Sequence, residues 1–128
     1  MASKTILVIE DNVLNMKLVK TLLEFQKYAV VTADDAEKGI QLAHDLHPDL
    51  ILMDIQLPGM DGLEATRRIK NDPDLKDIPI VALTSFAMEG DEEKALSAGC
   101  SGYIPKPIDT REFVQTIAQY YGPNEQGA

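Results

Sequence analysis

Four apolar runs of the sequence each end in polar residues with charged or reactive side chains. In chain order these residues are Glu10 and Asp11, Asp54, Thr84 and Ser85, and Lys106. A carboxylate can act as a nucleophile, a hydroxyl group donates hydrogen bonds, and an ammonium group pairs with anions. Brought together, these groups would form a pocket for a phosphoryl group, with Asp54 as its acceptor.

The three acids also point to a bound cation. Two full charges about 4–5 Å apart repel each other by roughly 3–4 kcal/mol at an effective dielectric constant near 20. If Glu10, Asp11 and Asp54 meet at one place, they must be partly protonated or bind a cation. A set of oxygen ligands without histidine or cysteine favours Mg²⁺, or the similar ion Mn²⁺.

Five strands alternating with five helices would bring these residues together. The expected strands are residues 5–9, 29–33, 50–54, 78–83 and 102–104, and the expected helices begin near residues 12, 34, 61, 89 and 109. Short apolar runs bounded by turn residues are typical of strands buried on both faces. The alternation predicts one α/β domain with a doubly wound parallel sheet of order 2-1-3-4-5, the flavodoxin-like fold. In that order strands one and three are neighbours, and the polar residues meet at the carboxyl edge of the sheet.

Two features of the helices give specific predictions. An apolar stripe at helical spacing predicts the core-facing side of the first helix: Leu14, Leu18, Leu22 and Phe25, widened by Val19 and Leu23. In the second helix, Asp34 followed by Glu37 fits a capping box, so Asp34 is the predicted N-cap.

Composition and charge narrow the classes of protein. The chain has 128 residues, 12 basic and 21 acidic, with a net charge of −9. A chain this acidic is a poor candidate to bind nucleic acid by itself. The apolar runs are far shorter than a membrane span, no signal peptide is visible, and the single cysteine is compatible with a reducing compartment, so a cytoplasmic location is expected.

In combination, these motifs resemble the receiver domain of bacterial two-component response regulators, from Lys4 to about Tyr121. They are Glu10-Asp11, Asp54 with Leu57-Pro58-Gly59-Met60-Asp61-Gly62, Thr84-Ser85 and Lys106-Pro107. Further runs resemble the stand-alone DivK-type regulators of cell division and polarity: residues 10–12, 14–16, 51–58, 86–88 and 90–93. The resemblance implies a receiver domain over residues 1–122 and a loose tail over 123–128, with no output domain.

The resemblance implies a phosphorelay role for the acidic residues. Asp54 would accept a phosphoryl group from a phosphohistidine on a sensor histidine kinase or a histidine phosphotransferase. Mg²⁺ would be held by Asp54 and by Asp11 directly, by Glu10 through water, and by the backbone carbonyl group of Gln56. The domain would promote its own phosphorylation, and also its own dephosphorylation, which would be slow. It would not be an enzyme in the ordinary sense.

The resemblance also assigns the residues around the acids. Lys106 would pair with the acyl phosphate, the Lys106–Pro107 bond would be cis, and Ser85 would contact the phosphate. Thr84 and Tyr103 match the family's switch pair, which would alter the surface of the fourth helix, fifth strand and fifth helix.

The implied partners are a kinase or phosphotransferase and a downstream kinase or effector protein, with the domain a monomer or weak dimer. The first partner would dock near the first helix and the loop that follows Lys106. Candidate contacts there are Leu14, Asn15, Met16 and Pro107, although core packing is the preferred interpretation of Leu14. Neither Gln56 nor Phe86, which flank the expected path of the hydrolytic water, is an acid, so slow autodephosphorylation is expected.

Alternative functions use the same residues differently. A phosphohydrolase of the haloacid dehalogenase type needs a second aspartate two residues after the nucleophile, where this chain has Gln56. A flavodoxin is disfavoured because Glu10 and Asp11 would repel a flavin phosphate. A receiver fold that serves only as a protein-binding scaffold, or a piece excised from a larger response regulator or hybrid kinase, stays open as an alternative.

Overall fold

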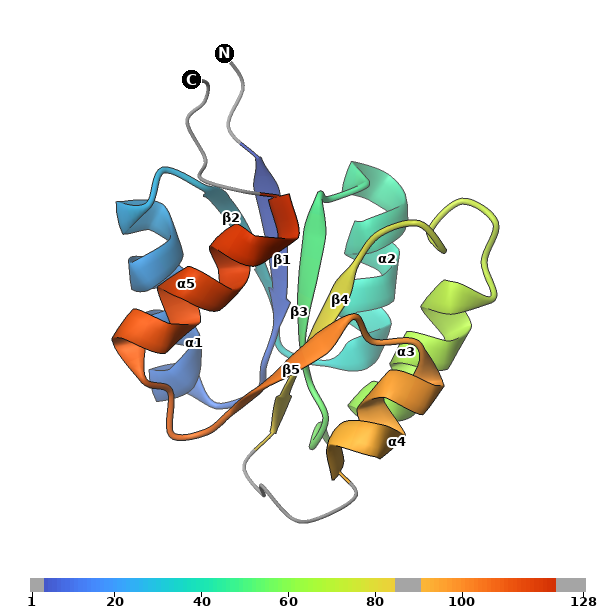
Figure 1. The fold of residues 1–128 in the computed structure, drawn as a ribbon. Helices are drawn as coiled ribbons and strands as arrows, with labels where there is room; N and C mark the ends of the chain where they lie inside the picture. Colours follow the sequence, from blue (N-terminus) through green and yellow to red (C-terminus); the bar gives the residue numbers. More distant parts are fainter. Residues whose placement is uncertain (1–3, 85–90, 122–128) are drawn as a thin grey trace.

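Five strands alternate with five helices along the chain, as predicted (Figure 1). This computed structural model describes residues 4–84 and 91–121. The strands are β1 (Thr5–Ile9), β2 (Ala29–Ala33), β3 (Leu50–Asp54), β4 (Ile80–Thr84) and β5 (Gly102–Pro105). The helices are α1 (Val13–Phe25), α2 (Ala36–Leu46), α3 (Gly62–Lys70), α4 (Asp91–Ala98) and α5 (Thr110–Tyr121). Strand β4 begins two residues later than predicted and includes Thr84.

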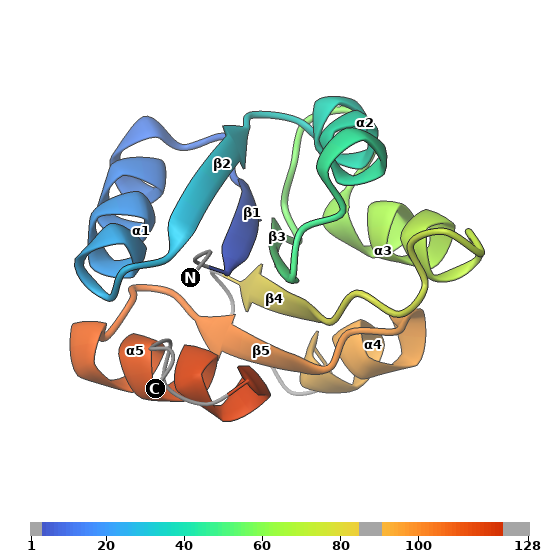
Figure 2. The same cartoon turned by 90° about the horizontal axis from the view of Figure 1, so that it is seen from above.

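The strands form one parallel sheet of order β2-β1-β3-β4-β5, which confirms the predicted flavodoxin-like winding. Seen from above, α1 and α5 cover one face of the sheet and α2, α3 and α4 cover the other (Figure 2). Because β5 is an edge strand, Pro105 can end it without removing a hydrogen bond from the interior of the sheet.

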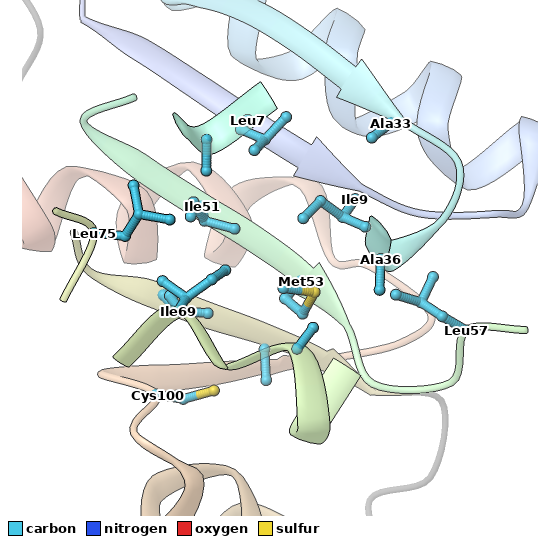
Figure 3. Close-up of a cluster of buried hydrophobic side chains, with 14 of the residues drawn as sticks. Leu7, Ile9, Ala33, Ala36, Ile51, Met53, Leu57, Ile69, Leu75 and Cys100 are labelled. Carbon is cyan, nitrogen blue, oxygen red and sulfur yellow. The ribbon is translucent and has the colours of Figure 1, made fainter. Parts of the chain in front are cut away.

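Two apolar layers, one on each face of the sheet, make the core. Alternate residues of β3 divide between them, since successive side chains of a strand point to opposite faces. Leu50 and Leu52 pack with α1 and α5, in a cluster that contains Phe113. Ile51 and Met53 pack on the other face, in the cluster drawn in Figure 3. The central strand is therefore held from both sides, and Asp54 follows at its end.

The predicted inward face of α1 is right only in part, for Leu22, Val19 and Leu23. Leu14, Leu18 and Phe25 are exposed, whereas Val19 and Leu23 are buried against the sheet. Both sets have helical spacing, so periodicity alone did not distinguish the inner side from the outer one. In particular, Leu14 does not pack in the core.

Side-chain caps begin α1, α2 and α3, with one correction to the prediction. Asp35 rather than Asp34 caps α2, because its side chain accepts a hydrogen bond from the backbone N–H of Lys38. Asp34 instead pairs with the ammonium group of Lys38 at 3.0 Å. Asn12 caps α1 as predicted, and Asp61 caps α3.

Among the described residues, no helix combines the length and apolar character that crossing a membrane requires.

Candidate functional site

The parallel register brings the ends of β1, β3, β4 and β5 to one edge of the sheet. Ile9, the last residue of β1, pairs with Met53, so Glu10 and Asp54 follow at neighbouring positions. Asp54 in turn pairs with Leu83, the residue before Thr84. The ends of the strands that carry Glu10, Asp54, Thr84 and Lys106 therefore lie side by side.

Glu10 is a fully buried acid whose two carboxylate oxygens face different groups. Oε2 accepts a hydrogen bond from the backbone N–H of Asn12 at 3.0 Å. Oε1 lies 2.6 Å from Nζ of Lys106, an ion pair without the angles of a directed hydrogen bond. The next residue, Asp11, is exposed. Glu10 is thus held inside the protein, whereas Asp11 lines an open cleft at the surface.

Asp54 is also buried, with 2% of its surface exposed. Its Oδ1 accepts a hydrogen bond from the backbone N–H of Gln56 at 2.9 Å, and its Oδ2 lies 3.2 Å from Nζ of Lys106. The ammonium group therefore sits between two buried carboxylates, Glu10 and Asp54. One positive charge balances only one of the two.

This imbalance alters the acidity of Asp54. Burial, and then the neighbouring Glu10, raise the pKa of Asp54 from 3.8 to about 6, against the opposing effects of the Gln56 N–H and Lys106. Burial acts in this direction because it disfavours the charged form of an acid. Ionised Asp54 is therefore held at a free-energy cost that added positive charge would relieve.

The acidic residues fit a divalent cation. Glu10, Asp11 and Asp54 each offer a carboxylate oxygen, and these three atoms lie within 4.8 Å of one another. They border an open cleft of about 400 Å³, whose lining also includes Gln56 and Lys106. An all-oxygen donor set with spare negative charge suits Mg²⁺ or Mn²⁺.

The proposed switch pair lies on neighbouring strands. Thr84 is buried and is paired with Pro105 in the sheet, and Tyr103, two residues earlier on β5, is half-buried. The Lys106–Pro107 bond is cis, as the resemblance implied. Ser85 and Phe86 lie outside the described residues.

Gly62, the last residue of the motif that follows Asp54, is a positioning residue. A Cβ atom at this position would collide with the backbone carbonyl oxygen of Asp54. The backbone N–H of Gly62 also donates a hydrogen bond to the carbonyl oxygen of Ile55 at 2.9 Å. The first turn of α3 is thus packed directly against the backbone of the acceptor strand. The Asp61-Gly62 pair, seven and eight residues after Asp54, is the signal in the sequence for this close approach.

Fold and site together define a receiver domain, and comparison with known proteins establishes the family. The chain belongs to the response regulator receiver domain family, which it matches over residues 6–118. It is similar to the polar-differentiation response regulator DivK of Brucella ovis, with 47% identity over 120 residues that cover 94% of this chain and 98% of the relative.

Two solved structures are informative neighbours. One is the receiver domain of a sensor histidine kinase from Pseudomonas aeruginosa, described with a magnesium ion coordinated in the active site cleft (TM-score 0.86, 34% identity, 93% of this chain and 98% of that chain). The other is the receiver domain of a response regulator from Saccharomyces cerevisiae, in complex with a histidine phosphotransfer signaling protein (TM-score 0.84, 28% identity, 91% and 88%).

Proposed function

We propose that this response regulator accepts a phosphoryl group on Asp54 from a phosphohistidine and changes its affinity for partner proteins as a result. The observation that carries the proposal is the ammonium group of Lys106, held 3.2 Å from Asp54 and 2.6 Å from Glu10 at the floor of an open cleft. A buried nucleophile beside a fixed cation is suited to an incoming group with negatively charged oxygens.

The transfer requires Asp54 to be ionised. Its free carboxylate oxygen attacks the phosphorus atom of the phosphoimidazole, so that an O–P bond forms while the P–N bond breaks. The electron pair of the broken bond stays on the imidazole nitrogen, which takes a proton from solvent. The N–H of Gln56 keeps Oδ1 in place, and Lys106 pairs with the phosphoryl oxygens that arrive.

Mg²⁺ is the cofactor of the proposed site. Asp11 and Asp54 would hold it directly, Glu10 through water, and Gln56 through its backbone carbonyl group. When bound, the ion supplies positive charge that offsets the charge on the phosphoryl group and the crowded carboxylates. The magnesium ion described for the P. aeruginosa receiver supports this assignment.

Phosphorylation would be read out through Thr84 and Tyr103. The hydroxyl group of Thr84 would turn toward the phosphoryl group, and the ring of Tyr103 would occupy the space released. The position of Tyr103 on an edge strand supports this, because its side chain is half-buried and packs only in part against the core. The surface formed by α4, β5 and α5 would then bind its target protein with altered affinity.

The phosphodonor would be a sensor histidine kinase or a histidine phosphotransferase that docks beside the cleft. Asn15 lines the cleft, and the exposed Leu14 offers an apolar contact next to it; Met16 and Pro107 complete the candidate contacts. The yeast receiver that was crystallised with a phosphotransfer protein supports this class of partner. The similarity to the polar-differentiation regulator DivK supports a role in cell polarity or the cell cycle. A cytoplasmic location is part of the proposal.

Incubation with acetyl phosphate and Mg²⁺, followed by intact-mass measurement, tests the proposal. Wild type should gain one phosphoryl group, and Asp54→Asn should gain none. The matched control Asp61→Asn removes an exposed aspartate and should be labelled like wild type. Absence of labelling on wild type, or equal labelling of Asp54→Asn, would favour a receiver fold used only as a scaffold.

The lifetime of the acyl phosphate tests the role of the neighbouring residues. Slow autodephosphorylation is expected because neither Gln56 nor Phe86 is an acid that could activate water. The label should therefore persist well beyond seconds once free acetyl phosphate is removed, and decay within seconds would contradict this reasoning.

A further inference from the structure

The apolar surface of helix α1 extends beyond its buried side, with the partly buried Leu22 between the buried and the exposed residues. Its inner side is buried, whereas Leu14, Leu18 and Phe25 on its outer side are 76%, 37% and 80% exposed. Spacings of four and seven residues place these three side chains on one line along the helix. At 1.5 Å per residue the line is about 16 Å long, nearly the length of α1. We call these three residues the outer stripe.

We infer that the outer stripe is a self-association surface, on which α1 of a second copy of this chain packs in the antiparallel direction, so that the second copy and the phosphodonor compete for Leu14. An exposed apolar line along a whole helix indicates a surface that binds another apolar surface. The strong acidity of the chain would oppose contact between two copies over most of the molecule. Helix α1 is an exception, because its charged residues are two lysines and one glutamate.

A two-fold axis through the middle of the stripe makes the two helices complementary. If the axis passes midway between Leu18 and Thr21, Leu14 of one copy lies opposite the partner's Phe25. Phe25, near the end of one helix, then contacts Leu14 near the start of the other. This contact occurs twice because the interface is isologous. The small Thr21 leaves room for the partner's Leu18 near the axis.

The charges beside the stripe fit the same register. Lys17 and Glu24 are seven residues apart and lie on one flank of the stripe. In the antiparallel pair, Lys17 of one copy lies about 3 Å along the axis from the partner's Glu24. Glu24 is half-exposed and only loosely paired with Lys20, at 3.8 Å, so it is accessible to the second copy. Two reciprocal ion pairs would therefore flank the apolar contact.

The expected association is weak and reversible. Two helices of 13 residues bury less than the roughly 1,600 Å² of a standard stable interface. Sedimentation equilibrium between about 20 µM and about 1 mM covers the affinities expected for such a contact. Wild type should rise from a mass of 14.1 kDa toward twice that value.

Matched serine substitutions test the apolar contact. Phe25→Ser and Leu14→Ser should each weaken association about tenfold or more, because each removes an apolar contact that the two-fold symmetry repeats. Leu46→Ser, at an exposed leucine of α2 with 47% exposure, is the control and should leave association unchanged. A chain that stays monomeric throughout, or a control that is as disruptive as Phe25→Ser, would overturn the inference.

A charge exchange tests the antiparallel register. Lys17→Glu and Glu24→Lys should each weaken self-association about fivefold, because like charges then face each other twice. An equimolar mixture of the two variants should associate again, since every pair in the mixed dimer has opposite charges. If the mixture associates no better than either variant alone, the proposed register is wrong.

Discussion

Replacing Asp54 by asparagine removes one of the two buried carboxylates that share Lys106 and keeps the shape of the side chain. The oxygen of the amide can still accept the hydrogen bond of the Gln56 N–H. We therefore expect Asp54→Asn to be more stable than wild type near neutral pH in the absence of Mg²⁺, although it lacks the phosphoryl acceptor.

The magnitude follows from the raised pKa of Asp54. The folded protein binds the proton of Asp54 more tightly than the unfolded chain does, with a pKa of about 6 against 3.8. The contribution of Asp54 to the free energy of unfolding is therefore lost as pH rises from 3.8 to about 6. The full difference corresponds to about 3 kcal/mol. Since the new NH₂ group faces the ammonium group of Lys106, the net gain for asparagine should be about 1–3 kcal/mol.

Urea unfolding in EDTA, near pH 7.5 and near pH 5, measures this difference. The advantage of Asp54→Asn should be about 1 kcal/mol smaller near pH 5, where Asp54 in the folded wild type is mostly protonated. Adding Mg²⁺ should stabilise wild type more than the variant, because the variant lacks one ligand. Glu37→Gln is the matched control, since it removes an exposed acid from the first turn of α2.

Two results would refute this reasoning. If Asp54→Asn were less stable than wild type near pH 7.5 without Mg²⁺, the ionised carboxylate would not be held at a cost. If Glu37→Gln stabilised the protein as much as Asp54→Asn, the gain would come from the lowered net charge rather than from the buried site.

Four further substitutions have expected effects on stability, measurable by urea unfolding. Lys106→Met should cost about 3 kcal/mol near pH 7.5 and less near pH 5, because it leaves two buried carboxylates without their cation; an equal loss at both pH values would contradict this. Gly62→Ala should cost about 2 kcal/mol and slow labelling by acetyl phosphate, because the new Cβ meets the acceptor backbone; a fully stable, rapidly labelled variant would show that the close approach does not matter. Leu14→Ser should change the stability of the monomer by less than about 0.5 kcal/mol, whereas Val19→Ala should cost about 2 kcal/mol; the reverse order would mean that α1 presents its other face to the sheet.

The sequence predicted the fold and the meeting of the site residues because both depend on strong signals. Uninterrupted apolar runs identify buried parallel strands, and the chemistry of such a sheet resides where those strands end. Glu10 and Asp54 lie beside each other because the register of β1 and β3 follows from this arrangement. The sharing of Lys106 between them depends on side-chain conformations, which no motif specifies.

Local choices between neighbouring residues were harder to predict. Asp34 and Asp35 are both good N-caps, and Asp35 takes this role because α2 begins directly after it, at Ala36. In α1 the apolar residues lie on two faces, so a periodic pattern was present on both the buried and the exposed side. Both faces carry apolar residues in the sequence, and only packing against the sheet determines which of them is buried.

The division of the core by the sheet has a consequence for how such a protein diversifies. Leu50 and Leu52 contact one layer and Ile51 and Met53 the other, so substitutions on opposite faces share few direct neighbours. Effects of mutations without shared contacts are close to additive. A lineage can therefore remodel α1 and α5 to suit a new partner without repacking α2, α3 and α4. The central strand, whose residues contact both layers, is the part of the fold with the least freedom to vary.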